Sequence, residues 1–295
     1  MNSSQFKKYQ FKHFCSSIGF EPKFVEPIAL NLDNYYREWK ENKPDKKNGG
    51  FKKYKDGTLK ERIIRPSLKE LKTIQRRIKD RILSPIQLPN HIHGGVKKRS
   101  NISNAKPHQG NKYQFTTDLQ NFFPGIKHDS IYNTFLSLGF SNHYSHWLTK
   151  FTTWKFELPQ GTPTSTHVAN LVFLKTDFRL IDLCNKNGII YTRYVDDLTF
   201  SSPNCFKHLL NDILEIVISN GFEISYRKTK YCGNQNITGI EVRNNFIDAP
   251  ERIKLMAKSE ENNDKEFKPY NIYLNNIRKT NKRITTGQQK VEVKI

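Results

Sequence analysis

Apolar residues recur at helical spacing in several stretches of the chain. In residues 66–83, "PSLKELKTIQRRIKDRIL", they lie at Leu68, Leu71, Ile74, Ile78 and Ile82. This period predicts an amphipathic helix, and Ser67 with Glu70 matches a capping box at its start.

Three further helices are predicted between residues 128 and 222. A short helix in 128–140 ends at Gly139, and a helix in 206–222 ends at Gly221; glycine is the usual residue just beyond a helix C-terminus. The longest runs from about residue 166 to 184, and its candidate core residues are Val168, Leu171, Val172 and Phe178.

Strand patterns alternate with these helices. "YQFTTDL" (113–119), "GIIYTRY" (188–194), "LTFSS" (198–202), "EISYRKTKY" (223–231) and "ITGIEV" (237–242) each predict a strand. Helices interspersed with such strands indicate an α+β sheet with helices on one face. Near the end, 271–284 has a helical pattern at Ile272, Leu274, Ile277 and Ile284, and "TTGQQKVEVKI" (285–295) is either disordered or a final strand.

The charge of the chain points to a polyanionic partner. Its 49 Lys and Arg exceed its 28 Asp and Glu, a net charge of +21 at pH 7, and residues 37–99 hold 20 of the basic and 7 of the acidic residues. Nucleic acid is favoured over an acidic membrane surface as this partner. For the Lys-rich loop "NKPDKKNGGFKKYKDG" (42–57), the alternative is a basic face exposed only to solvent. The longest apolar run, "ANLVFL", is too short to span a membrane.

The four cysteines are widely scattered, with neither a C-x-x-C pair nor a matching histidine spacing. We therefore expect no disulfide framework and no zinc site in a soluble, intracellular protein.

Two adjacent aspartates, Asp196 and Asp197, lie between the strands at 188–194 and 198–202. If these strands form a hairpin, the pair lies at its tip, and Asp118 ends an earlier strand in a comparable setting. Carboxylates that converge in one cleft need a cation, and Mg²⁺ prefers hard oxygen ligands. Two such ions can clamp a phosphoryl displacement. The alternative is that Asp-Asp is simply a common turn dipeptide.

Five sequence blocks resemble the reverse transcriptase family, in the family's order within residues 62–230. They are "RIIRPSLKELKTIQRRI", "FTTDLQNFFPGI", "LPQGTPTSTHVANL", "YVDD" and "ISYRKTKY". The resemblance implies an α+β right-hand polymerase. Fingers and an N-terminal segment would occupy 1–110 and continue within 125–165. The palm would be mainly 111–241, with a short thumb and tail in 242–295.

The resemblance also implies roles for individual residues. Asp118, Asp196 and Asp197 would hold two Mg²⁺ ions, and Lys228 would be the general acid for pyrophosphate, with a solvated strand lysine as the alternative. Phe123 would lie under the sugar and exclude a 2′-hydroxyl, with a plain core aromatic as the alternative. The nucleotide-binding set would be Arg62, Leu119, Phe123, Gln160 and Gly161.

A narrower resemblance is to retron reverse transcriptases. Asn104, Ala105 and His108 match their N-A-x-x-H pattern, and "ITG" (237–239) is similar to their V-T-G. The candidate RNA-binding residues are Arg76, Arg77, Asn104 and His108.

The retron resemblance implies an enzyme of the bacterial cytoplasm that binds a structured non-coding RNA. It would copy part of that RNA from dNTPs, starting at a guanosine 2′-hydroxyl, to leave branched RNA–DNA. A separate effector protein and a role in antiphage defence would follow, with no membrane partner. The alternatives are a non-retron defence-type reverse transcriptase and, in another class, a catalytically silent RNA-binding scaffold.

Overall fold

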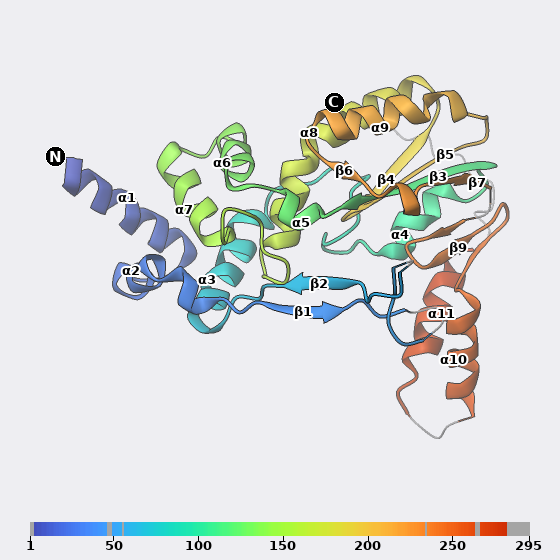
Figure 1. Cartoon of the computed structure of the whole chain (residues 1–295), viewed down its shortest axis with the longest axis horizontal. Helices are drawn as coiled ribbons and strands as arrows, with labels where there is room; N and C mark the ends of the chain where they lie inside the picture. Colours follow the sequence, from blue (N-terminus) through green and yellow to red (C-terminus); the bar gives the residue numbers. More distant parts are fainter. Residues whose placement is uncertain (1–2, 46–48, 55, 234, 263–265, 282–295) are drawn as a thin grey trace.

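The computed structural model describes residues 3–45, 49–54, 56–233, 235–262 and 266–281. A helical N-terminal region with a two-stranded arm leads to a central sheet backed by helices, and a C-terminal helix pair follows (Figure 1). The expected α+β class is confirmed by this mixture of helices and antiparallel strands. Within the described residues, no helix is long and apolar enough to cross a membrane.

The central sheet is antiparallel and is built around one strand. Its strands are β3 (Tyr113–Gln120), β4 (Ile190–Tyr194), β5 (Asp197–Ser202), β6 (Glu223–Ile224) and β7 (Lys230–Cys232). The order is β4-β5-β3-β6, and β7 also pairs with β3. The β4–β5 hairpin expected around the aspartate pair is therefore present, and its register sets Asp197 opposite Asp118 on β3.

The strand predicted over 223–231 is wrong in its middle. A 3-10 turn, Tyr226–Lys228, separates β6 from β7. β6 pairs with the end of β3 and β7 pairs with its beginning, so the turn bulges out near the middle of β3. The segment has little side-chain alternation that would hold one flat register, so it pairs twice with a break between.

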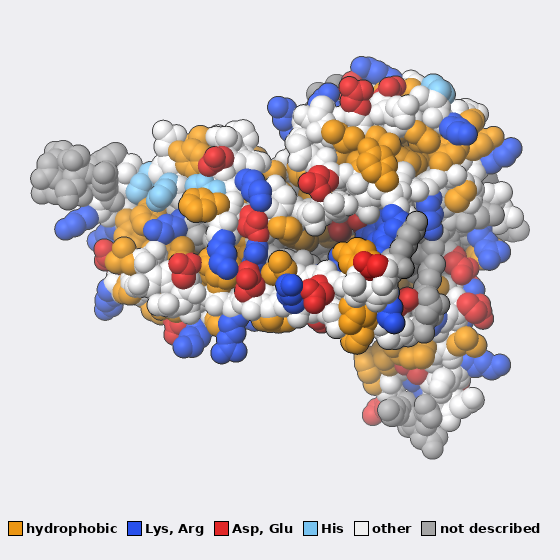
Figure 2. All heavy atoms as spheres, viewed as in Figure 1, with side chains coloured by type: hydrophobic (Ala, Val, Ile, Leu, Met, Phe, Trp, Pro, Cys, Tyr) orange, Lys and Arg blue, Asp and Glu red, His pale blue; other side chains and the backbone are white. Residues whose placement is uncertain are grey.

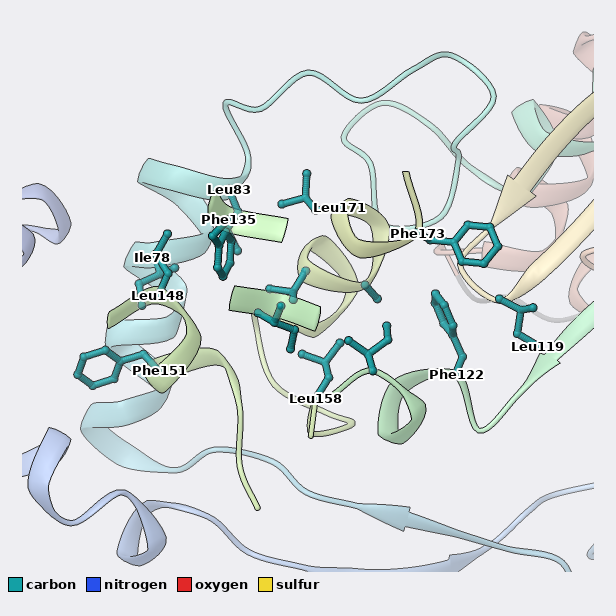
Figure 3. Close-up of a cluster of buried hydrophobic side chains, with 14 of the residues drawn as sticks. Ile78, Leu83, Leu119, Phe122, Phe135, Leu148, Phe151, Leu158, Leu171 and Phe173 are labelled. Atoms are coloured by element: carbon teal, nitrogen blue, oxygen red, sulfur yellow. The ribbon is translucent and has the colours of Figure 1, made fainter. Parts of the chain in front are cut away.

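Two helices, α8 (Ser165–Lys186) and α9 (Leu210–Ser219), pack in the main hydrophobic core with the sheet. Val168 and Leu171 are buried as predicted, but Phe178 is 56% exposed. The phase of α8 instead turns Phe173 inward, where its ring meets Phe122 edge-on at 5.9 Å (Figure 3). This contact joins α8 to α5 (Phe122–Gly125) within the main hydrophobic core.

The N-terminal region combines helices with the arm. From the start of the chain it contains α1 (Ser3–Ile18), α2 (Pro22–Leu30), β1 (Trp39–Asn42), β2 (Glu61–Ile64), α3 (Lys69–Ile78) and a π-helical turn (Lys79–Leu83). Two helices from later in the chain, α6 (His128–Ser137) and α7 (Asn142–Thr152), belong to the same region. The predicted capping box is wrong, because the N-cap is Leu68 and no side chain caps α3. Ser67 is buried and its hydroxyl has no hydrogen-bond partner among the described residues.

A second hydrophobic cluster lies in the C-terminal region. It joins α4 (Asn101–Ala105) to β8 (Asn236–Ile237), β9 (Ile240–Val242), β10 (Ile247–Asp248), α10 (Glu251–Glu261) and α11 (Pro269–Lys279). Leu274 and Ile277 are buried there as predicted, whereas Ile272 is 49% exposed because it lies on the other face of α11. Ile284 and the segment 285–295 lie outside the described residues. The domain boundaries remain predictions.

Ile277→Ala should loosen this second cluster without altering the central sheet. Ile277 is fully buried, so its truncation should cost about 2–4 kcal/mol. Amide hydrogen exchange should show lost protection in 236–279 and little change in β3–β5. Ile272→Ala on the exposed face is the matched control, and equal losses for both variants would contradict the assignment.

Candidate active site

The three candidate aspartates converge at one corner of the central sheet. Asp118 and Asp197 lie opposite each other on β3 and β5, and Asp196 occupies the turn before β5. The Leu119 amide donates a 3.0 Å hydrogen bond to the Asp196 carbonyl, which ties the turn to β3. One oxygen from each carboxylate lies within 4.8 Å of the other two.

Burial and mutual repulsion make ionisation of this group costly. Burial, followed by the neighbouring Asp118 carboxylate, raises the pKa of Asp196 to about 6. Burial, then Asp196 and Asp118, raises the pKa of Asp197 to about 8. The Lys228 ammonium lies 2.6 Å from Asp118 Oδ2, so one cation faces three acidic groups.

A divalent cation fits this donor set. Three carboxylates supply hard oxygen ligands, and Mg²⁺ or a similar ion would stabilise the ionised forms of Asp196 and Asp197, whose pKa values are raised. Lys228 reaches the group because the Ser225 amide donates to the Asp118 carbonyl at 2.8 Å, which fixes the start of the 3-10 turn. The bulge that breaks the predicted strand is thus what brings Lys228 to the aspartates.

Asp118 and Asp196 line a large, highly charged cleft of about 1540 Å³. This volume exceeds that of a typical small-molecule pocket. In Figure 2 the surface is hollowed between the central sheet and the β1–β2 arm, with blue Lys and Arg side chains at its edge. The cleft is lined by basic and acidic side chains. The basic ones are Lys43, Lys52, Lys60, Arg62, Arg65, Arg227 and Lys228, and the acidic ones are Asp45, Asp56, Glu61, Asp118, Glu157 and Asp196. Such a cleft can hold a phosphate-rich polymer.

Two arginines of the arm face the cleft and are already paired. Arg62 donates to Glu41 through Nε at 3.0 Å and Nη2 at 2.8 Å. Arg65, which the sequence reasoning missed, pairs with Glu38 and Glu157. The available signal was a second arginine three residues after Arg62 and directly before Pro66, and both arginines line the cleft.

The other predicted nucleotide-binding residues lie around the same cleft. The Gln160 carbonyl accepts from the Arg65 amide at 2.8 Å, and Gly161 follows with φ +107°, a conformation that requires glycine. Phe123, in α5 (Phe122–Gly125), is partly buried and lines the cleft beside the aspartates. Leu119 is 2% exposed, so it contributes to the site mainly through its backbone amide, which bonds to the Asp196 carbonyl.

The four candidate RNA-binding residues separate into two groups. Arg76 and Arg77 are exposed on α3. Asn104 and His108 are fully buried, which does not fit direct contact with RNA. His108 Nδ1 lies 2.6 Å from Ser201 Oγ, and burial lowers the pKa of His108 to about 3.

The retron-like residues instead make a contact within the protein. Asn104 Nδ2 donates to Thr238 Oγ1 at 3.3 Å, so the N-A-x-x-H and "ITG" segments touch. Asn101, at the start of α4, donates to the Thr238 carbonyl at 3.1 Å and to the Tyr273 hydroxyl at 2.6 Å. The two segments thereby connect the central sheet to the second cluster.

A buried ion pair behind the aspartate turn was also missed. Arg193 on β4 and Asp177 on α8 are both fully buried, 2.6 Å apart. The signal was a lone arginine within an otherwise apolar strand, "IIYTRY", because a charge at such a position needs a buried partner.

Three acidic groups that converge beside a large cleft form a candidate metal site. The family model for reverse transcriptase (RNA-dependent DNA polymerase) matches residues 46–248. The chain belongs to that family, which confirms the resemblance inferred from the five blocks and, with it, the right-hand polymerase fold.

Curated relatives refine the likeness. Retron Ec86 reverse transcriptase of Escherichia coli is 36% identical over 185 residues, covering 61% of this chain and 58% of that protein. Retron Se72 reverse transcriptase of Salmonella heidelberg (strain 579083-10) is 31% identical over 186 residues, covering 63% and 46%. The chain thus spans about half the length of these relatives. The structure of telomerase from Candida albicans with a telomeric RNA fragment has a TM-score of 0.49 and 10% identity, covering 82% of this chain and 53% of that chain.

Asp197→Asn should stabilise the protein in the presence of a chelator. The folded state binds the Asp197 proton more tightly than the unfolded chain does, so ionisation disfavours folding as pH rises from about 4 to about 8. The variant removes this penalty, and its Tm at pH 8 should exceed that of the unmodified protein by roughly 2–4 °C per kcal/mol relieved.

The difference between the two Tm values should shrink towards pH 4, and Mg²⁺ should reverse it at pH 8. Exposed Asp212 supplies the control variant Asp212→Asn. An Asp197→Asn protein that melts below the unmodified protein at pH 8 in chelator would contradict the electrostatic account.

Proposed function

We propose that this chain is an RNA-directed DNA polymerase. The observation that carries this proposal is the convergence of Asp118, Asp196 and Asp197, the first two of which line the cleft. Family membership supports the same reading. Two Mg²⁺ ions bound there would activate the attacking oxygen and stabilise the leaving group.

The protein's own residues have distinct parts in this proposal. The three aspartates would hold the ions, which would orient the α-phosphate for attack. Lys228, half-exposed and 2.6 Å from Asp118 Oδ2, can turn to the departing pyrophosphate and donate its proton. Arg62 binds the triphosphate once its guanidinium exchanges Glu41 for phosphate oxygens, which suit the same planar fork.

Selection of the sugar falls to Phe123. Its ring lies in the cleft lining, supported from behind by Phe122 with ring centroids 5.6 Å apart. A ring fixed in this way leaves no room for a 2′-hydroxyl, and deoxynucleotides are preferred. Gln160 and Gly161 complete the nucleotide site beside the arm.

We further infer that the enzyme is of the retron type and works in the bacterial cytoplasm. It copies part of a structured non-coding RNA, starts from a guanosine 2′-hydroxyl, and acts with a separate effector protein in antiphage defence. Support comes from the retron relatives and from the contact between the two retron-like segments. Arg76 and Arg77, exposed on α3, remain candidate RNA contacts.

Asp196→Asn should abolish DNA synthesis, by more than about 100-fold, while RNA binding persists. The change removes a ligand charge at constant size and leaves the basic side chains of the cleft in place. The protein is expressed with its native flanking DNA, and co-purified nucleic acid is treated with ribonuclease, deoxyribonuclease and debranching enzyme. A short DNA joined to RNA by a 2′-5′ bond, absent from the variant, is expected.

Other outcomes of this experiment separate the alternatives. DNA without a branch would replace the retron reading with another defence-type reverse transcriptase. Bound RNA with no DNA would favour the catalytically silent scaffold. DNA synthesis by Asp196→Asn in Mg²⁺ would overturn the assignment of the metal ligands.

Phe123→Ala should admit ribonucleotides, because it opens space beneath the sugar. We expect the preference for dNTPs over rNTPs to fall roughly 10- to 100-fold, measured by single-nucleotide extension. Phe156→Ala removes an exposed aromatic (80% exposed) and is the matched control. Unchanged sugar selectivity would make Phe123 a core aromatic only.

A further inference from the structure

The turn that carries Asp196 has an unfavourable backbone conformation. Val195 has φ +59°, in the left-handed region. A β-branched residue is disfavoured there, because its side chain meets the neighbouring backbone. The surrounding structure must therefore hold the turn in place.

Arg193 bonds directly to this turn from the side opposite the cleft. Its Nη1 donates to the Val195 carbonyl at 2.9 Å and to Asn170 Oδ1 at 2.8 Å. Asn170 Nδ2 in turn donates to the Gly94 carbonyl at 2.9 Å. A Cβ atom at Gly94 would lie 2.4 Å from the Val195 nitrogen, so this segment fits against the turn only as glycine.

Asp177 fixes the direction of the Arg193 guanidinium. Arg193 Nη2 and Nε meet the two oxygens of Asp177 at 2.6 and 3.0 Å, a bidentate pair. The Tyr191 hydroxyl also donates to Asp177 at 2.7 Å, and the Phe173 ring lies 4.8 Å from the guanidinium. These contacts hold the arginine in one orientation, while the buried His91 Nε2 lies 3.8 Å from Asp177 Oδ1 without a hydrogen bond.

We propose that Arg193 is a positioning residue that holds the Val195 turn so that Asp196 and Asp197 meet Asp118 in metal-binding geometry. The consequence of this role of Arg193 for catalysis rests on the proposed function. A fully buried ion pair can often be replaced by apolar residues without loss of stability, so folding alone does not account for it. The directional bond to the Val195 carbonyl does.

The test replaces the pair with apolar residues of similar size, Arg193→Met together with Asp177→Leu. Tyr191→Phe is added, because the Tyr191 hydroxyl would otherwise lose its acceptor. Neither charge is then left buried alone, so the protein should keep its Tm within a few degrees. Mn²⁺ affinity, measured by titration without nucleic acid, should fall about tenfold. Hydrogen exchange should quicken at the Leu119 amide, which bonds to the Asp196 carbonyl.

Arg193→Lys is the second variant. It keeps the charge next to Asp177 but lacks a planar fork that can also reach the Val195 carbonyl, so the same losses are expected even if the triple variant fails to fold. Asp182→Ala with Lys186→Ala removes an exposed ion pair from the same helix and is the control.

Wild-type Mn²⁺ affinity and Leu119 protection in either folded Arg193 variant would overturn the proposal. Failure of the proposed function is distinguishable. If the unmodified protein binds Mn²⁺ but makes no DNA, the polymerase assignment fails, while the metal affinities and exchange rates still decide the role of Arg193.

Discussion

Repulsion among three acidic groups in one corner of a sheet is the constraint around which this protein is built. The register of β3 with β5 forces Asp118 and Asp197 together, and the following hydrogen bond from Leu119 brings in Asp196. The backbone sets this proximity, because the hydrogen bonds between strands form whatever the charges of the side chains. Asp196 and Asp197 are therefore weaker acids than free aspartate. A bound cation would favour their ionised forms.

The basic side chains around the site differ in their burial and in their acidic partners. Arg193 is neutralised by Asp177 and contributes direction more than charge. Within the described residues, Lys228 is the cation that forms an ion pair with the aspartate group, and its side chain remains half-exposed. In the arm, the pairs that Arg62 and Arg65 form with acidic residues moderate the field of the cleft. Phosphate must compete with carboxylate there, which favours ligands that present several oxygens at once.

Local patterns in the sequence predicted most of the framework. Helical periodicity located α3, α8, α9 and α11, and strand patterns with the motif spacing located the hairpin and its aspartates. Errors arose where long-range contacts outweigh local preference. Phe178 fits a helical stripe but faces solvent, and the strand around Lys228 breaks because β3 pairs with it twice. Arg193 pairs with Asp177 on α8, so no short stretch of sequence could predict the pair.

The burial of Asn104 and His108 changes the meaning of the retron-like segments. A recurring motif need not touch the ligand of its family. Here the motif joins the central sheet, through His108 and Ser201, to the second cluster, through Asn104 and Thr238. Such bonds set the angle between the aspartate site and helices α10 and α11. The buried motif therefore contributes to how these parts of the chain pack together.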